Sequence, residues 1–243
     1  MNRFGLLGKN ISYSFSQGYF SEKFKALGLN DHSYENFDIQ KIDEFKNVIA
    51  QDNLKGLNVT IPYKQDVIPY LDELDAKAEK IGAVNTIQFT ENGLKGFNTD
   101  AYGFQKSLEP FLKPHHKNAL ILGTGGASKA VRFVLDQLGI ANTYVSRNKN
   151  QGQYTYGEVD KGIIEKNTLI INCTPLGTYP NVEDKPALPY QYIESKHLLY
   201  DLIYNPEKTS FLASGEAKGA IICNGLSMLE HQAEKAWEIW NNV

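Results

Sequence analysis

Two side chains in the first hundred residues could together move a proton. Lys64 follows the apolar segment 56–61, and Asp100 follows a second apolar segment that ends near Phe97. In open α/β sheets ligands bind beyond the carboxyl ends of strands, so we expect both side chains at one cleft. A lysine can donate a proton to a carbonyl oxygen as hydride reaches the carbon, while a carboxylate holds the lysine and a substrate hydroxyl. The pair predicts reduction of a ketone; the alternative is a surface lysine and a helix-capping aspartate.

A glycine-rich turn between a strand and a helix gives the second chemical signal. Residues 118–128 read NALILGTGGAS, an apolar strand that runs into glycine and then into a helical pattern. Such a turn directs backbone N–H groups and the positive end of a helix at a pyrophosphate. The third position of the G-x-G-x-x-G/A spacing is Ser128, so a purely structural turn is the alternative. The turn consists of Gly123, Thr124, Gly125 and Gly126.

The end of the next strand indicates which dinucleotide would bind. An NAD site usually has Asp or Glu roughly 20 residues after the first glycine, to hold the ribose 2′-hydroxyl. Here the sequence Val145-Ser146-Arg147-Asn148-Lys149 contains no carboxylate. Arg147 could stack on adenine and pair with a 2′-phosphate, with Ser146 donating a hydrogen bond and Lys149 adding charge. We predict NADP rather than NAD; a solvated basic turn is the alternative.

Other polar residues follow or interrupt apolar segments. In Ser12-Tyr13-Ser14-Phe15-Ser16, alternate hydroxyls and the start of a helix could hold a carboxylate, or Ser14 and Ser16 could serve only as an N-cap with a spare hydroxyl. Asn85 lies inside an apolar strand and needs a partner, which is either a substrate hydroxyl or a neighbouring backbone group.

Four residues in the second half could contact a bound ligand. Thr174 follows an apolar strand where the ribose and nicotinamide of a cofactor would pass, and Gly225 would let the backbone approach a flat ring. Tyr204 and Gln232 could reach a polar ligand in the cleft. Their alternatives are a half-buried aromatic and a solvated helix residue.

The elements that must position these residues alternate between strand and helix, which predicts an α/β fold with a mostly parallel sheet. We expect residues 1–100, completed by a C-terminal helix in 226–243, to form a substrate-binding catalytic domain. Residues 101–225 would form a Rossmann-like NADP-binding domain. The predicted strands are 3–7, 33–39, 56–61, 84–90, 94–97, 118–123, 141–146, 168–172, 198–201 and 220–224, and the predicted helices are 16–27, 42–51, 64–71, 75–81, 102–112, 129–138 and 227–240.

The composition is that of an ordinary globular protein. The chain has 243 residues, 42% hydrophobic and 22% charged, with a net charge of −3 and no long run of one sign. This charge argues against a nucleic-acid partner, and the lack of a long apolar run argues against a membrane span. Cys173 and Cys223 form no metal-spaced cluster, so we expect no metal and a reducing, cytoplasmic location. Monomer and homodimer both remain open.

Taken together, the ordered motifs resemble the shikimate dehydrogenase family. The resemblance covers nearly the whole chain. Its motifs are Ser14-Phe15-Ser16, residues 58–64 (NVTIPYK), 82–86 (GAVNT), 96–100 (GFNTD), 123–128 (GTGGAS), 200–204 (YDLIY) and 224–229 (NGLSML), with Gln232.

The resemblance implies a two-domain α/β enzyme that reduces 3-dehydroshikimate to shikimate with NADPH, in aromatic amino-acid biosynthesis. It implies that Lys64 and Asp100 are the catalytic pair and that Ser14 and Ser16 bind the substrate carboxylate. The ring hydroxyls would be surrounded by Thr60, Asn85, Asp100, Tyr204 and Gln232. The cofactor would be held by residues 123–127, including Ala127, by Ser146 to Lys149, and at the nicotinamide by Leu202, Gly225 and Met228.

The sequence departs from the family pattern at three positions. Gln17 stands where the family usually has Pro, Ser146 where it often has Asn, and Ser227 where it often has Gly. A quinate/shikimate dehydrogenase of broader specificity is one alternative. A non-catalytic dinucleotide-sensing protein is another, but a sensor has no use for the proton donor Lys64.

Overall fold

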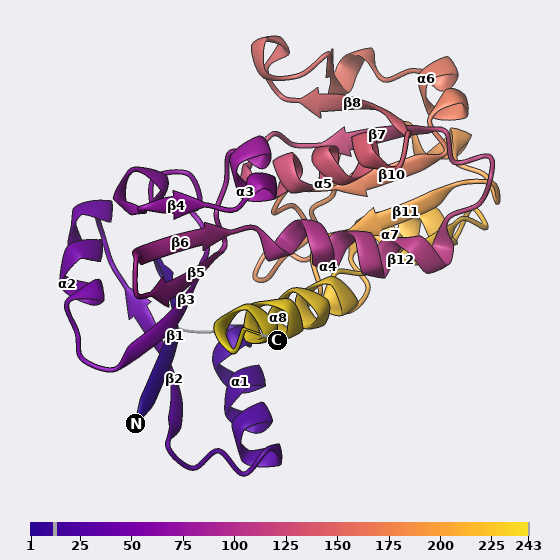
Figure 1. The fold of residues 1–243 in the computed structure, drawn as a ribbon. Helices are drawn as coiled ribbons and strands as arrows, with labels where there is room; N and C mark the ends of the chain where they lie inside the picture. Colours follow the sequence, from indigo (N-terminus) through magenta and orange to yellow (C-terminus); the bar gives the residue numbers. More distant parts are fainter. Residues whose placement is uncertain (12–13, 243) are drawn as a thin grey trace. The chain divides into compact units, whose positions relative to one another are not determined.

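Two separate six-stranded sheets organise the chain, one in each of two compact units (Figure 1). The computed structural model describes residues 1–11 and 14–242. Unit 1 comprises residues 1–99 and the C-terminal segment that begins at Ala233, and unit 2 comprises Asp100–Gln232. The last helix, α8 (Leu226–Trp240), therefore contributes residues to both units.

The sheet of unit 1 is mixed, with strand order β2-β1-β3-β5-β6-β4. β1 pairs in parallel with β2 and β3, whereas β5 runs antiparallel to β3 and β6. Glu91 and Asn92 form the turn between β5 and β6, next to which Thr90 pairs with Gly93. The strands are β1 (Asn2–Gly8), β2 (His32–Asp38), β3 (Leu54–Val59), β4 (Glu73–Leu74), β5 (Thr86–Thr90) and β6 (Gly93–Phe97), and the helices are α1 (Phe15–Ala26), α2 (Phe45–Ile49) and α3 (Ala76–Ile81).

The predicted helix 64–71 is wrong. The segment after β3 forms successive turns and a short 3₁₀ helix, η2 (Ile68–Tyr70). The carbonyl of Lys64 accepts a hydrogen bond from the amide of Val84 at 2.7 Å, so it is used by a distant segment instead of by a helical turn. Pro69 also lies inside the segment and has no N–H to donate to the carbonyl four residues earlier. A tertiary hydrogen bond and a proline together override the local pattern.

The C-terminal segment completes the core of unit 1. The indole N–H of Trp240 donates to the carbonyl of Ile87 at 3.0 Å, and its ring packs against Phe4 and Phe20. A Cβ at Gly56 would lie 2.2 Å from the indole nitrogen, so only glycine fits beneath this ring. Residues from both ends of the sequence thus share one hydrophobic cluster.

The sheet of unit 2 is parallel throughout, with strand order β12-β11-β10-β7-β8-β9. This is the 3-2-1-4-5-6 order of the Rossmann fold, which places a ligand crevice beyond the carboxyl ends of β7 and its neighbours. The strands are β7 (Asn118–Leu122), β8 (Ala141–Ser146), β9 (Tyr154–Thr155), β10 (Leu169–Asn172), β11 (Leu198–Asp201) and β12 (Ile221–Cys223), and the helices are α4 (Thr99–Leu108), α5 (Gly126–Gln137), α6 (Lys161–Lys166), α7 (Ser210–Glu216) and the first part of α8.

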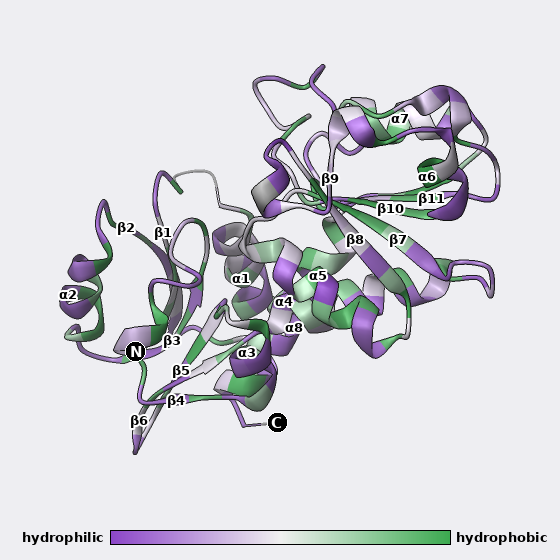
Figure 2. Cartoon of the chain, turned by 90° about the horizontal axis from the view of Figure 1, so that it is seen from above, coloured by the Kyte–Doolittle hydropathy of each residue, from purple (hydrophilic) through white to green (hydrophobic). Residues whose placement is uncertain are grey.

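The central strands of this sheet are apolar and fully enclosed. Residues 119–122 and 169–171 are completely buried, and β7 has hydrophobic colour along most of its length in Figure 2. Helices cover both faces of such a sheet, so its strands read as continuous apolar runs. Within the described residues, no helix is both long enough and apolar enough to span a bilayer.

Candidate active site

Five polar side chains form a connected network inside unit 1. The hydroxyl of Tyr34 donates to Oδ1 of Asn58 at 2.7 Å, and Nδ2 of Asn58 donates to Oγ1 of Thr86 at 3.2 Å. Thr86 in turn contacts Oδ1 of Asn85, which accepts the amide of Thr99 at 2.6 Å. Each of the five is buried, and burial raises the pKa of Tyr34. The network contains hydroxyl and amide groups, which stay neutral at any physiological pH.

Of the two partners considered for Asn85, the structure shows the backbone one, which is the amide of Thr99. Besides accepting the amide of Thr99, Asn85 donates from Nδ2 to Oγ1 of Thr99 at 3.0 Å. These two bonds fix the first residue of α4, which immediately precedes Asp100. Binding of a substrate hydroxyl by Asn85 stays a prediction.

Ser14 and Ser16 lie at the start of α1. Oγ of Ser14 accepts the amide of Ser16 at 3.1 Å, so Ser14 is the N-cap of the helix. Ser16 is buried near Tyr34, where it opposes the rise that burial causes in the pKa of the tyrosine. Ser12 lies outside the described residues. The capping role is thus observed, and the carboxylate-binding role stays a prediction.

Thr60 directly follows β3, and Lys64 lies in the turns that replace the predicted helix. Lys64 is half-buried, and its carbonyl is bonded to Val84, the residue before Asn85. The amide of Thr60 donates to the carbonyl of Leu7 at 2.9 Å. Asp100 is buried in the first turn of α4, at 6% exposure. Segment 84–85 thus holds the backbone of Lys64 and, through Thr99, the start of α4; the pairing of the Lys64 and Asp100 side chains stays a prediction.

Two helices of unit 2 meet at a glycine one turn after Asp100. A Cβ at Gly103 would lie 2.4 Å from the carbonyl oxygen of Met228 and 3.1 Å from Cβ of Gln232. Only glycine permits this contact between α4 and α8. Asp100, Met228 and Gln232 are therefore carried by helices in direct contact, and all three are buried.

The glycine turn has the predicted strand–turn–helix layout. Gly123 has φ +94°, its amide donates to the carbonyl of Val145 at 2.8 Å, and a Cβ there would lie 2.9 Å from Cγ2 of Thr174. Gly125 is the N-cap of α5. Among the described residues, no side chain accepts from the first turn of α5 as a cap and no acidic residue lies in that turn. The amides at this helix start thus have the character of an anion site.

The hydroxyl of Ser128, at the third position of the glycine spacing, has a hydrogen-bond partner within the turn. It donates to the carbonyl of Gly125 at 2.7 Å, and the residue is 1% exposed. The hydroxyl is satisfied inside the turn itself, so the additional atom costs no buried unpaired group.

The basic turn after β8 contains an interaction that the sequence analysis missed. Ser146 is buried and its Oγ accepts the amide of Asn148 at 3.4 Å, while Arg147 and Lys149 are exposed. Lys149 forms an ion pair with Glu158, which comes from the next turn along the chain. The only sequence signal was the spacing Thr155-x-x-Glu158, which is typical of a capping box.

A second polar network lies beneath the carboxyl ends of β10 and β11. Asp201 is completely buried; Oδ1 accepts from Nδ2 of Asn172 at 3.0 Å and Oδ2 accepts from the hydroxyl of Thr209 at 2.6 Å. Oδ1 of Asn172 accepts both the amide and the hydroxyl of Thr174, at 3.0 and 2.6 Å. Burial raises the pKa of Asp201 to about 6, against these hydrogen bonds, which lower it. The network fixes the loop that carries Thr174.

Asp201, Asn172 and Thr209 were not predicted from the sequence as functional residues. The available signal was a polar residue closing each of two adjacent apolar strands, which requires buried partners.

Gly225 lies against the loop after β11. Its amide donates to the carbonyl of Ile203 at 3.0 Å, and a Cβ would lie 2.1 Å from the carbonyl oxygen of Leu202. Glycine is therefore required for this close backbone approach. Tyr204 follows in the same loop and is half-buried, which raises its pKa.

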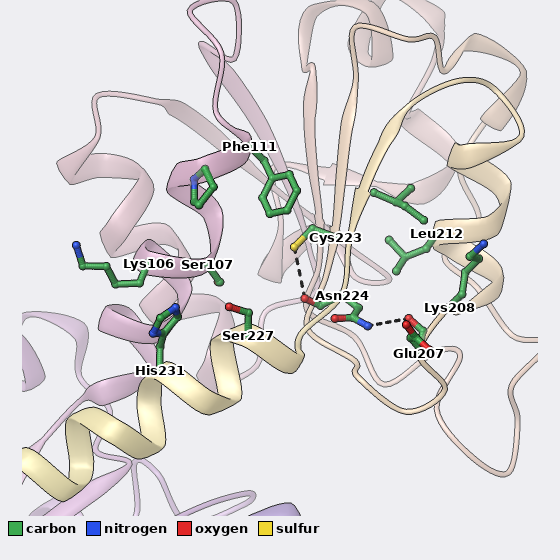
Figure 3. Close-up of a pocket in the computed structure, with 12 residues that line it drawn as sticks. Lys106, Ser107, Phe111, Glu207, Lys208, Leu212, Cys223, Asn224, Ser227 and His231 are labelled. Carbon is green, nitrogen blue, oxygen red and sulfur yellow. Dashed lines mark hydrogen bonds between the residues drawn. The ribbon is translucent and has the colours of Figure 1, made fainter.

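Unit 2 also contains a cavity of about 690 Å³ between α4, β12 and the first turns of α8 (Figure 3). Ser107, Cys223, Ser227 and His231 are among its lining residues, and Nδ2 of the lining Asn224 donates to a backbone carbonyl at 2.9 Å. None of the residues predicted to bind substrate or cofactor lines it, and the whole lining belongs to the described part of unit 2. The predicted cofactor-binding residues therefore do not form the wall of this cavity.

Comparison with known proteins identifies the family. Residues 6–87 match the family model of the shikimate dehydrogenase substrate binding domain. A relative from Methanosphaera stadtmanae named shikimate dehydrogenase (NADP(+)) is 40% identical over 97% of this chain and 90% of its own length. The chain belongs to the shikimate dehydrogenase family.

Solved structures of the family share the whole fold. Shikimate dehydrogenase 1 from Peptoclostridium difficile is 39% identical, with a TM-score of 0.89 over 100% of this chain and 93% of its own. The enzyme from Thermus thermophilus, solved in complex with NADP(H) and shikimate, is 31% identical, with a TM-score of 0.89 over 100% of this chain and 94% of its own. The α/β fold with a Rossmann-like part, predicted from the sequence, is confirmed.

Proposed function

We propose that this chain is an NADP-dependent shikimate dehydrogenase, which catalyses the reversible reduction of 3-dehydroshikimate to shikimate in aromatic amino-acid biosynthesis. The observation that carries the proposal is full-length similarity to relatives named for this activity, at 40% identity over 97% of the chain. The Rossmann strand order and the glycine turn of unit 2 support it independently.

Lys64 and Asp100 carry the proton chemistry in this proposal. The ammonium of Lys64 donates a proton to the ketone oxygen as the carbonyl carbon receives hydride; in the reverse direction its amine takes the hydroxyl proton. Asp100 orients Lys64 and accepts a substrate hydroxyl. The support is that hydrogen bonds hold the backbone at both positions: the carbonyl of Lys64 accepts the amide of Val84, and Asp100 follows Thr99, whose amide donates to Asn85.

Polar side chains would hold the substrate through its carboxylate and its hydroxyls. Ser14 and Ser16 bind the carboxylate at the start of α1, where the helix dipole favours negative charge. The ring hydroxyls are bound by Thr60, Asn85, Asp100, Tyr204 and Gln232.

The residues of unit 2 fit a dinucleotide. A Cβ at Gly123 would fill the space beside Thr174, and the start of α5 offers amides to a pyrophosphate. NADPH bound there supplies the hydride. The pyrophosphate would be held by residues 123–127. Ser146, Arg147 and Lys149 would hold the adenosine 2′-phosphate, and Thr174, Leu202, Gly225 and Met228 would border the ribose and nicotinamide.

An absorbance assay at 340 nm with the purified chain tests the proposal. Shikimate and quinate are each offered with NADP⁺ and with NAD⁺ at mildly alkaline pH. We expect the highest kcat/KM for shikimate with NADP⁺. Comparable turnover of quinate with NAD⁺ would favour a broader quinate/shikimate dehydrogenase, and NADPH binding without oxidation of shikimate would favour a sensing protein.

We further propose that the enzyme acts in the cytoplasm on small-molecule substrates alone, as a monomer or a homodimer. The support is that Cys173 and Cys223 are both free thiols, as a reducing compartment favours. Sedimentation of the purified chain separates the two oligomeric states.

A further inference from the structure

A carboxylate lies beside the turn at which the 2′-phosphate would bind. β9 pairs in parallel with β8, and Thr155 lies opposite Ser146 in this pairing. The turns that follow the two strands therefore emerge at the same edge of the sheet. The first turn carries Lys149 and the second carries Glu158, and their side chains form an ion pair. No carboxylate directly follows β8 in the sequence, but the turn after β9 brings Glu158 to the same place.

Glu158 is held in place by its own turn. Its Oε2 accepts the amide of Thr155 at 2.8 Å and the hydroxyl of Thr155 at 3.0 Å, which leaves Oε1 to meet Lys149. The hydrogen bond from Lys149, followed by those from Thr155, lowers the pKa of Glu158 to about 2. The carboxylate is therefore a fixed charge at any pH at which the enzyme would work.

We propose that Glu158 limits the preference for NADP by competing with the 2′-phosphate for Lys149. This inference rests on the proposed function, because it requires the adenosine end of the cofactor to lie at the end of β8. When Lys149 turns to the phosphate, Glu158 loses its partner and faces a like charge, and both effects oppose binding. NAD has no 2′-phosphate and leaves the ion pair intact. Glu158 is thus a specificity-determining residue that weakens one cofactor selectively.

The expected size of the effect follows from the exposure of the pair. The side chains of Lys149 and Glu158 are 68% and 38% exposed, so solvent and salt screen their interaction. Replacing the carboxylate with an amide should tighten NADP⁺ binding by about two- to fivefold. The substitution Glu158→Gln keeps a side-chain oxygen that accepts from Thr155, so it preserves the turn.

Calorimetric titration of the full chain with NADP⁺ and with NAD⁺ tests the inference. The variants are E158Q, K149Q, the double variant and the control E216Q. Glu216 is the last residue of α7 in the same unit and forms an exposed ion pair with Lys208 at 2.8 Å. We expect E158Q to tighten NADP⁺ about two- to fivefold and to leave the dissociation constant of NAD⁺ unchanged. The gain should shrink in the K149Q background, where only the repulsion between Glu158 and the 2′-phosphate is left, and it should also shrink in high salt. E216Q should change neither dissociation constant.

The outcomes separate this inference from the proposed function. A wild-type chain that binds neither dinucleotide overturns both. A wild-type chain that binds NADP⁺, with E158Q unchanged, overturns the inference alone. Equal tightening of NADP⁺ and NAD⁺ also overturns it, because the effect would not come from the 2′-phosphate. A gain that is undiminished in the K149Q background overturns it too, because Glu158 would not be competing for Lys149. Thermal unfolding of each variant establishes that it is folded.

Discussion

The two units each bury a polar network beneath residues predicted to bind ligands, but the two networks differ in charge. In unit 1, hydroxyl and amide groups connect Tyr34 to Thr99 through Asn58, Thr86 and Asn85. In unit 2, the network centres on the carboxyl group of Asp201, whose pKa is raised to about 6 by burial.

The two networks therefore differ in how their hydrogen bonds respond to pH. A neutral network contains no group that titrates at physiological pH, so its strength does not vary with pH. A buried carboxylate makes stronger hydrogen bonds, but its charge is expensive to bury and is lost in acid. The unit that carries Lys64 is thus held by neutral groups, and the unit that carries the glycine turn tolerates an ionisable one.

The largest expected effect tests where the chemistry resides. Lys64→Ala should lower kcat by about 10²–10⁴-fold, because a general acid is lost, while NADPH binding in unit 2 is unchanged. Steady-state kinetics and a fluorescence titration of NADPH measure the two quantities. Lys55→Ala, an exposed lysine on β3, is the matched control. A K64A enzyme with full kcat would remove Lys64 from the mechanism.

The next effect tests the ionisable network through pH. The pKa of Asp201 is raised to about 6 in the folded chain, and it is about 3.9 in an unfolded chain. The folded state therefore binds an additional proton between these values, and stability falls as the pH rises through this window. About two pKa units correspond to about 3 kcal/mol.

D201N lacks this titration. The unfolding free energy of the wild type minus that of D201N should fall by about 3 kcal/mol between about pH 4 and pH 7, measured by urea unfolding. Neighbouring Tyr200 and Cys173 have raised pKa values and stay neutral in this range. A difference independent of pH would show that Asp201 titrates normally.

A matched pair of isosteric substitutions compares the networks directly. Thr209→Val removes a hydroxyl that donates to the Asp201 carboxylate and caps α7, and should cost about 2–3 kcal/mol at pH 7.5 and less at pH 4.5. Thr86→Val removes a hydroxyl from the neutral network and should cost about 1 kcal/mol at both pH values. Urea unfolding at the two pH values measures both. Equal pH dependence in the two variants would contradict the distinction between the networks.

The smallest expected effect concerns cofactor binding, whereas the first concerned kcat. Arg147→Ala should weaken NADP⁺ binding by about five- to tenfold and leave NAD⁺ within about twofold, because one charged contact to a 2′-phosphate is lost. Calorimetry measures both constants, and Lys161→Ala, an exposed lysine paired with Glu165 in the same unit, is the control. Equal weakening of both dinucleotides would place Arg147 away from the 2′-phosphate.

The sequence predicted the elements best where short apolar runs end at turn residues. β8 and β11 have the predicted bounds, and the strand, turn and helix around Gly123 follow the predicted layout. β9 was not predicted, because two residues in a polar stretch form a strand only through pairing with β8. The helix predicted at 64–71 failed for a similar reason: a distant amide, that of Val84, takes the carbonyl that the helix would need.

The candidate site was predictable as a set of motifs but not as a set of contacts. Ser14, Asn85 and Gly225 were recognisable as residues that need a particular partner or conformation. Their partners were not, because hydrogen bonds such as Tyr34 to Asn58 join residues from different strands. Glu158 was overlooked because the expected position for an acid was directly after β8, whereas pairing of β9 brings it there from another turn.

The place of Trp240 under the sheet of unit 1 has a consequence for biosynthesis. The ribosome makes the first 99 residues early, but they lack their indole ring and the bonds of Gln88 to Ile239 and Asn242 until the last helix emerges. Residues 100–232 are continuous in the sequence and are made in between. We therefore expect residues 100–232 to fold on the nascent chain first, before residues 1–99 acquire the contacts that α8 provides.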